Sequence, residues 1–244
     1  MATIGGVTEQ QRLRYSNVAI FLHWAIAALI LYNLTSGLLR PVLPRGFFAL
    51  HVSSGITILA LTVVRVLWRL THRPPPFLPM AQWERGMAHL THFLLYAAML
   101  ALPLSGWAMV SASPPAGSPG AGWAMAHRPP PPPPSPTGKP DTRSPGGPAG
   151  EGKGGGMAPR ARGPIMVWGL FPLPMIGPIN ELGRTPEGVP GQREVHERIE
   201  TVHLIGGWVM LALLLLHVAG ALKHQLVDRR RELARMGLGR TRAV

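Results

Sequence analysis

The sequence predicts an all-α integral membrane protein, a four-helix bundle with a long disordered Pro/Gly-rich outer loop between helices 3 and 4. Three observations support this fold class. Of the 244 residues, 46% are apolar and only 14% are charged, which is unlike the charged surface of a soluble domain. Four apolar stretches approach or exceed the roughly 20 residues of helix that cross a hydrocarbon core. Between the third and fourth lies a segment rich in Pro and Gly that cannot bury enough apolar surface to fold.

The four predicted spans follow one another along a single membrane domain, residues 1–244. They are residues 18–39, 51–70, 88–112 and 203–227. The first is too long for the apolar region of a signal peptide, and no cleavage site followed by a soluble domain comes after it. We therefore expect all four to remain as membrane-spanning helices.

Basic residues at the helix ends predict the orientation. The ends before span 1, between spans 2 and 3 and after span 4 carry Arg12, Arg14, Arg65, Arg69, Arg73, Arg85 and the tail "KHQLVDRRRELARMGLGRTR". The short connection between spans 1 and 2 carries only Arg40 and Arg45. By the positive-inside rule, the protein is multi-pass with both termini in the cytoplasm, and the outside is the periplasm or its equivalent. The loop between spans 3 and 4 is also basic, but a long loop counts for less in this rule.

That loop contains a low-complexity insertion at about residues 112–163, with six consecutive prolines at 129–134. We expect the insertion to be disordered. The following stretch, "PIMVWGLFPLPMIGPINELGR", is apolar but interrupted by four prolines, so it is not a fifth span. It is expected to lie over the outer end of the bundle. A short amphipathic helix, "GQREVHERIETV", then leads into span 4.

Histidines inside the spans are the candidate functional residues, because ionisable groups in a membrane are costly. His203 and His217 are fourteen residues apart in span 4. On a helix this spacing returns to within about 40° of the same face and rises about 21 Å. From the alternating direction of the spans, His51 should lie at the level of His203, and His23 at the level of His217. The sequence thus predicts two histidine pairs, one near each membrane surface.

Each pair suits a metal-containing cofactor. Neutral imidazole binds Zn, Cu or Fe, and two axial histidines in an apolar helix bundle are typical of low-spin haem. Zinc would require three or four ligands at one level, so haem is favoured. The chain has no Cys, which excludes covalently attached haem and Cys-ligated iron–sulfur clusters. The spans contain no paired carboxylates, nucleophile motif or phosphate loop, so the chemistry would belong to the cofactor.

Four stretches together resemble the bacterial cytochrome b561 family, whose members include superoxide:ubiquinone oxidoreductases. They are "RYSNVAIFLHWAIAA", "LHVSSGITILALTVVRVLWRL", "MAHLTHFLLYAAMLALPLSGW" and "HLIGGWVMLALLLLHVAGALKH". The resemblance implies two haem b groups with His23, His51, His203 and His217 as axial iron ligands. It also implies ubiquinone as the electron acceptor, with His224 as a possible quinone contact. The alternative for His224 is an interfacial residue beside a basic tail.

Other histidines have competing interpretations. His89 and His92, near the inner end of span 3, could ligate the inner haem, bond a propionate or bind a quinone headgroup. His196 could replace His203, but it lies about 31 Å from His217 on a continuous helix, so we expect it in a loop outside the hydrocarbon. His72 and His127 are expected to be solvated.

Three classes of function remain. The first is an enzyme that oxidises superoxide, a choice that rests on the resemblance, and reduces ubiquinone. The second is a haem b subunit between a partner dehydrogenase and the quinone pool, and the third is a non-redox membrane carrier. For the first, a basic outer surface would attract the anion, and its arginines would be Arg40, Arg45, Arg184 and Arg193. The net charge of +13 is split across the membrane without a recognition helix, so no nucleic-acid partner is expected.

Overall fold

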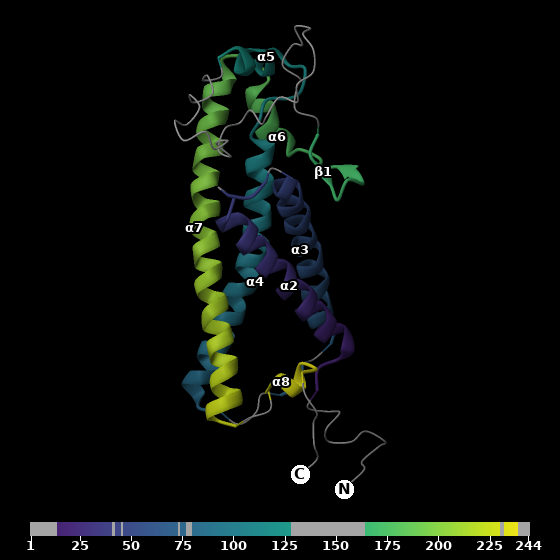
Figure 1. Ribbon diagram of the computed structural model, residues 1–244, viewed down its shortest axis with the longest axis vertical. Coiled ribbons are helices and arrows are strands. Elements are labelled where there is room, and N and C mark those ends of the chain that lie inside the picture. The colour runs from purple at the N-terminus through teal and green to yellow at the C-terminus, as the bar shows by residue number, and fades with distance from the viewer. Residues whose placement is uncertain are drawn as a thin grey trace. The chain divides into compact units, whose positions relative to one another are not determined.

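The computed structural model describes residues 14–40, 42–44, 46–72, 74–76, 80–127, 164–229 and 232–238. Four long helices make up most of this part of the chain (Figure 1). They are α2 (Asn17–Leu38), α3 (Gly46–Thr71), α4 (Gln82–Ser111) and α7 (Gly188–Leu222). Each is long and apolar enough to cross a membrane. The predicted all-α membrane fold is thereby confirmed, and the protein is a multi-pass membrane protein.

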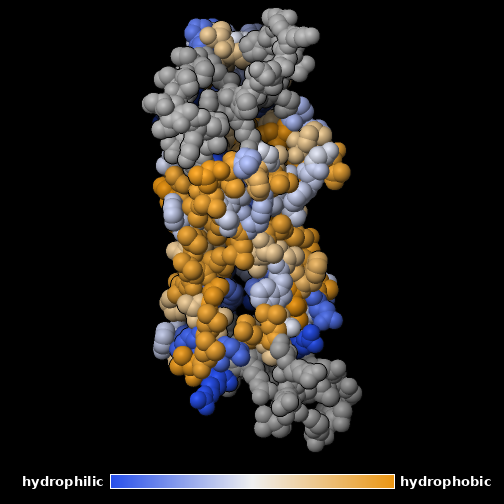
Figure 2. Space-filling view, viewed as in Figure 1, coloured by the Kyte–Doolittle hydropathy of each residue, from blue (hydrophilic) through white to orange (hydrophobic). Residues whose placement is uncertain are grey.

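The apolar side chains of these helices face outward as much as inward. Only 6–22% of the residues in the most apolar window of each helix are buried. Exposed examples are Phe21, Leu67, Phe93 and Leu215, and Figure 2 shows hydrophobic residues over the visible surface of the helices. Such a surface is too apolar for water and suits lipid contact.

The chain divides into two compact units, and each takes a segment from all four long helices. Unit 1 contains residues 1–31, 57–102 and 206–244, and unit 2 contains residues 32–56 and 103–205. In α4 the boundary falls at Pro103, which lies inside the helix. Proline lacks the N–H for an interior helical hydrogen bond. His23 and His217 fall in unit 1, and His51 and His203 fall in unit 2.

Short elements complete unit 2 after the third long helix. They are α5 (Pro119–Ala126), the antiparallel strands β1 (Met166–Val167) and β2 (Phe171–Pro172), α6 (Gly177–Asn180) and the 3-10 turn η1 (Glu181–Gly183). Unit 1 ends with a π-helical turn, η2 (Lys223–Val227), and with α8 (Glu232–Arg235).

The predicted outer segment, residues 164–187, is held by polar contacts to α3 and α4 and contains no fifth span. The Trp168 N–H donates to the Ser53 hydroxyl at 2.9 Å. The Trp107 indole donates to the Pro174 carbonyl at 2.7 Å, and the Ile176 N–H donates to the Ser111 hydroxyl at 3.0 Å. Since buried backbone groups need partners, these contacts fix an otherwise irregular segment.

The predicted start of the disordered insertion at residue 112 is wrong for residues 112–127. The Ser118 side chain caps α5 by accepting from the Ala121 N–H at 3.1 Å. The Gly120 N–H donates to the Arg184 carbonyl at 2.9 Å, and a side chain at Gly120 would collide with the Gly183 carbonyl. Composition cannot reveal such a contact, because it depends on one glycine. The rest of the predicted insertion, residues 128–163, lies outside the described residues.

The last long helix begins earlier than hydropathy predicts. The stretch expected to be a separate amphipathic helix is part of α7, which runs without a break from Gly188 to Leu222. His196 therefore lies in a helix, and its expected place in a loop is wrong. Its Nδ1 atom lies 3.0 Å from the Met109 carbonyl. Hydropathy marks only the lipid-facing part of a helix, so it missed this polar first section.

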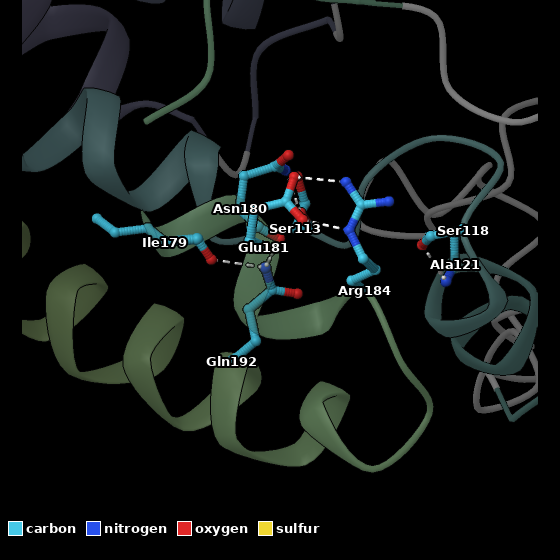
Figure 3. A network of polar contacts seen from close by, with 8 residues as sticks. All are labelled: Ser113, Ser118, Ala121, Ile179, Asn180, Glu181, Arg184 and Gln192. Atoms are coloured by element: carbon cyan, nitrogen blue, oxygen red, sulfur yellow. Dashed lines mark hydrogen bonds and ion pairs between the residues drawn. The ribbon is translucent and has the colours of Figure 1, made fainter. Parts of the chain in front are cut away.

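Gln192 joins the start of α7 to residues 164–187. Its side chain is 1% exposed and donates to the carbonyls of Ile179 at 2.9 Å and Asn180 at 3.0 Å. Asn180 in turn donates to the Ser113 carbonyl at 2.7 Å. Figure 3 shows these contacts from α7 toward the turn that carries Glu181 and Arg184. One buried amide thus satisfies two carbonyl groups.

Replacing Gln192 by alanine should lower the free energy of unfolding by about 1–3 kcal/mol, because two buried carbonyls lose their donor. Thermal unfolding of the detergent-solubilised protein, followed by circular dichroism, would measure this as a lower Tm. The matched control is Glu194→Ala, two residues away, which removes only an exposed ion pair with Arg198. Equal Tm values for the two variants would contradict the role given to Gln192.

Candidate functional site: two histidine pairs

The first pair, here called the outer pair after its predicted orientation, consists of His51 on α3 and His203 on α7. Their ring centroids are 6.4 Å apart, and the rings are inclined at 74°. Both side chains are half-buried. The structure thus brings together two histidines that the sequence separates by more than half of the chain.

Each outer histidine is held by a serine from a neighbouring helix. The Ser36 hydroxyl lies 3.0 Å from His51 Nδ1, and the Ser105 hydroxyl lies 2.9 Å from His203 Nδ1. Ser36 is on α2 and Ser105 on α4, so all four long helices contribute to the outer pair. A shallow, open depression of about 380 Å³ lies next to Ser105, lined by Leu104, Ser105, Ala108, Arg198, Ile199 and Val202.

The second pair, here called the inner pair, consists of His23 on α2 and His217 on α7. Their ring centroids are 6.2 Å apart, and the rings are inclined at 69°. His92 on α4 lies beside this pair, with its ring centroid 5.1 Å from that of His217. Its Nδ1 atom is 2.6 Å from the Ala88 carbonyl, so Nδ1 carries the proton and Nε2 carries the lone pair. His92 is therefore chemically able to replace one member of the pair.

A cation accompanies the inner pair. The Arg65 guanidinium donates to the Tyr96 hydroxyl at 2.9 Å and to the Ala19 carbonyl at 3.4 Å. Ala19 is one turn before His23 on α2, so this contact brings the charge of Arg65 close to the inner pair. A charged group within a span is by default a functional feature. Here it places positive charge near the inner pair.

The spacing of both pairs fits an iron atom held between two imidazoles. Two metal–imidazole bonds of about 2.0 Å, extended to the ring centres by roughly 1.1 Å at each end, give a centroid separation of about 6.2 Å. The observed separations are 6.2 and 6.4 Å. The imidazoles and the adjoining apolar helices therefore fit an axially ligated haem.

His224 belongs to a different cluster at the end of α7. Its Nδ1 lies 2.7 Å from an Asp228 carboxylate oxygen, and the Lys223 ammonium is hydrogen-bonded to both Glu84 and Asp228. The hydrogen bond from His224 and the nearby Lys223 hold the pKa of Asp228 below its usual range, although partial burial opposes this shift. Ligand atoms of Glu84, His224 and Asp228 lie within 4.8 Å of one another. Lys223 already supplies a cation there, so we assign no metal to this cluster.

The remaining histidines lie apart from both pairs. The His72 ring stacks on Trp68 at 3.7 Å, and the His127 ring stacks on Trp123 at 4.2 Å. His89 is exposed on α4. These positions suit interfacial or surface residues.

The described outer arginines are paired with carboxylates. Arg40 lies 3.9 Å from Glu200, Arg193 lies 2.9 Å from Glu197, and Arg184 pairs with Glu181. Arg45 lies outside the described residues. Paired charges have a much weaker field at a distance than isolated ones. These arginines therefore attract an anion less than their number in the sequence suggests.

Sequence reasoning missed several residues of the site. Ser36 and Ser105 were overlooked because serines are common in membrane helices, and only the rotation of α2 and α4 directs them at the histidines. Each is followed by a glycine, which is the one signal in the sequence that could have drawn attention to them. Arg65 was counted only as a topology signal.

Comparisons with known proteins identify the family of this chain. A family model described as prokaryotic cytochrome b561 matches residues 14–239. A probable superoxide oxidase CybB from Yersinia pestis is 33% identical over 102 residues, which are 40% of this chain and 58% of the relative. Cytochrome b561 homolog 1 of Escherichia coli (strain K12) is 29% identical over 107 residues, 41% of this chain and 61% of the relative. Homolog 2 of the same organism is 33% identical over 107 residues, 41% of this chain and 56% of the relative. The matches thus span about three fifths of the length of these relatives.

Proposed function

This chain belongs to the prokaryotic cytochrome b561 family of haem b-binding membrane electron-transfer proteins, and we propose that it is a di-haem b superoxide:quinone oxidoreductase. The observation that carries this proposal is the presence of two histidine pairs, each at a separation compatible with an iron atom between two imidazoles. A single pair would serve a mono-haem protein. Two pairs that share one helix suit electron transfer across the membrane.

In this proposal His51 and His203 hold one haem b, and His23 and His217 hold the other. Bound haem b supplies reversible one-electron chemistry at its iron. The helices exclude water around the imidazoles, and Arg65 adds a fixed positive charge near the inner pair. This charge favours a reduced state there over an oxidised one.

The proposed reaction balances as two superoxide anions and one quinone, with two protons, giving two molecules of oxygen and one quinol. Each superoxide loses one electron on the outer side. The quinone gains two electrons and two protons from the inner side. Superoxide as the donor rests on the name of the Yersinia pestis relative, and the lipid-soluble acceptor would be ubiquinone.

His224 is the proposed quinone contact. Its Nδ1 is directed at Asp228, so in the protonated form the ring donates Nδ1–H to that carboxylate and Nε2–H to a quinone carbonyl oxygen. Lys223 and Glu84 complete a polar cluster that can hold a proton and replace it after transfer. In the proposed orientation, with both termini in the cytoplasm of a bacterial inner membrane, this cluster takes its protons from the cytoplasm.

The visible spectrum of the purified protein tests whether it binds haem b. We expect a Soret band and an alpha band of b-type haem that appear in full on reduction by dithionite, with two haems per chain by pyridine haemochrome. Stopped-flow mixing of superoxide with the oxidised protein should then reduce haem faster than superoxide dismutes spontaneously. A haem-containing protein that superoxide does not reduce would instead favour a haem subunit for a partner dehydrogenase. A protein without haem would leave only the non-redox carrier.

Residues 128–163 offer a test of how superoxide is attracted. This segment carries six basic residues and two acidic ones: Arg128, Lys139, Arg143, Lys153, Arg160 and Arg162, with Asp141 and Glu151. Replacing it by a short Gly/Ser linker should leave the haem content unchanged and lower the superoxide rate several-fold at low salt, because the net positive charge of this segment is lost. The rate should be measured from 10 to about 300 mM salt.

The matched control for this deletion is the same segment with six basic residues changed to glutamine. Equal rates and equal salt dependence in the wild-type protein and both variants would rule out this source of attraction. Loss of haem from the linker variant would show that residues 128–163 support the bundle, contrary to our expectation.

A further inference from the structure

Two Ser–Gly dipeptides on different helices hold the two members of the outer pair in the same way. Ser36 and Gly37 on α2 contact His51, and Ser105 and Gly106 on α4 contact His203. The serine hydroxyl reaches Nδ1, and the glycine lies against the same ring. A side-chain carbon added at either glycine would lie 3.2 Å from the ring carbon Cε1. The position of each ring is thus restricted by a serine hydroxyl at Nδ1 and by the glycine backbone near Cε1.

The hydrogen bonds at Ser36 favour one tautomer of the His51 ring. The Ser36 hydroxyl donates to the Asn33 carbonyl at 3.2 Å, which uses its single proton. The serine oxygen, 3.0 Å from Nδ1, is then free to accept from His51, which favours the tautomer with the proton on Nδ1. In that tautomer the lone pair of the imidazole is on Nε2, the atom left for a metal. Ser36 is 7% exposed, so water does not readily replace this contact.

A hydrogen bond accepted from Nδ1–H changes the electronic character of a ligating imidazole. It draws the proton away from the ring, which makes Nε2 a more basic ligand. A more basic ligand stabilises ferric iron more than ferrous iron. Serine hydroxyls at both rings would therefore lower the midpoint potential of the outer haem. The inner pair instead has a guanidinium nearby, and a positive charge raises a midpoint potential.

We propose that Ser36 and Ser105 are positioning residues that fix the Nδ1–H tautomer of His51 and His203 and lower the midpoint potential of the group held between them. Gly37 and Gly106 allow the rings to approach the helices closely enough for these hydrogen bonds. This inference rests on the proposed haem ligation. Its consequence is that the outer haem has the lower potential of the two, which favours electron flow toward the inner pair.

Redox titration of the purified full-length protein tests the proposal, with the alpha band followed against potential. The outer component is identified as the one missing from His203→Ala. Ser36→Ala and Ser105→Ala should each shift the reduction equilibrium of that component roughly tenfold toward the ferrous form, which is about 59 mV for one electron. The double variant should show roughly the sum of the two shifts, because the serines contact different ligands. The other component should keep its potential.

Matched controls separate the hydroxyl from a general loss of packing. Ser54→Ala removes a buried hydroxyl from α3 that bonds Asn33 and the main chain and does not contact the ring of His51, so its potential should remain that of the wild-type protein. Ser36→Thr and Ser36→Val have nearly the same shape, and only threonine retains the acceptor. Threonine should keep the low potential and valine should raise it, even if alanine proves unstable. Equal potentials for threonine and valine would overturn the proposal.

The glycines provide a second readout. Gly37→Ala and Gly106→Ala should change the low-spin electron paramagnetic resonance signal of the outer component, because the added methyl group pushes the ring from its position. Gly46→Ala, where an added carbon meets nothing within 4 Å, should leave that signal unchanged. A wild-type protein without haem would refute the proposed function. A protein that binds two haems, but whose midpoint potentials and paramagnetic resonance signals stay the same in all the serine and glycine variants, would refute only the present inference.

Discussion

Alanine in place of His203 or His51 is expected to abolish binding of the outer haem and to leave most of the inner haem in place, whereas alanine at His217 or His23 should do the reverse. Each pair lies in a different compact unit of the chain, so the loss of one ligand acts mainly within its own unit. With only one axial ligand left, the haem is held less firmly and dissociates more readily. Haem content should therefore fall from two groups per chain to about one, measured by pyridine haemochrome.

The controls for this prediction are His196→Ala and His92→Ala. His196 lies on α7 before His203 and contacts the Met109 carbonyl instead of the outer pair, so its variant should keep two haems. Retention of two haems by His203→Ala together with loss of one from His196→Ala would refute the assignment.

The second control concerns His92. The centroids of the His92 and His217 rings are 5.1 Å apart, so His92→Ala should change the spectrum of the inner haem without loss of that haem. Loss of the inner haem from His92→Ala but not from His23→Ala would identify His92 as the ligand.

Alanine in place of His224 is expected to lower the rate of quinone reduction more than tenfold while both haems remain bound and reducible by dithionite. The change removes the proposed headgroup donor without touching either histidine pair, and general acid catalysis typically contributes a factor of about 10²–10⁴. Steady-state reduction of a soluble quinone analogue, beside haem reduction by superoxide in the absence of quinone, separates the two steps. His89→Ala is the matched control, because His89 is an exposed histidine on α4. Loss of quinone reduction in His89→Ala but not in His224→Ala would identify His89 as the quinone contact.

The pH dependence of this step follows from Asp228. Its pKa is held low in the folded protein, mainly by the hydrogen bond from His224. The carboxylate and its contact with His224 are therefore fully formed above the ordinary pKa of aspartate, about 3.9. They are lost only as the pH falls through the lowered value. Quinone reduction should thus show no loss attributable to Asp228 between about pH 5 and pH 8, and Asp228→Asn should weaken it across that whole range.

The sequence predicted the histidine pairing because helix geometry alone determines the levels. Fourteen residues on one helix place His203 and His217 at different depths on one face, and alternating spans then assign His51 and His23 to them. The structure brings these residues together in the expected pairs. Their role as ligands stays a prediction. The family resemblance, which rested on the order of all four helices, is confirmed by the match over most of the chain.

Features that depend on contacts between helices could not be predicted from the sequence. The serines at His51 and His203 depend on how α2 and α4 are rotated, which residue spacing does not encode. The ordered residues 112–127 depend on one close approach at Gly120. The polar start of α7 was not predicted, because hydropathy recognises only helical segments that are apolar. In each case the deciding interaction joins residues far apart in the chain.

In the proposed di-haem protein, the sharing of α7 by both pairs also determines when the cofactors can bind. His23 and His51 are synthesised early, but both of their partners, His217 and His203, are on the last of the four long helices. At the usual rate of about 5–20 residues per second, many seconds of synthesis separate the first histidine of each pair from the second. During that interval the early helices are in the membrane without a complete site. With the proposed ligands, cofactor loading follows insertion of the final helix, and nascent chains arrested before it should reach the membrane as colourless precursors.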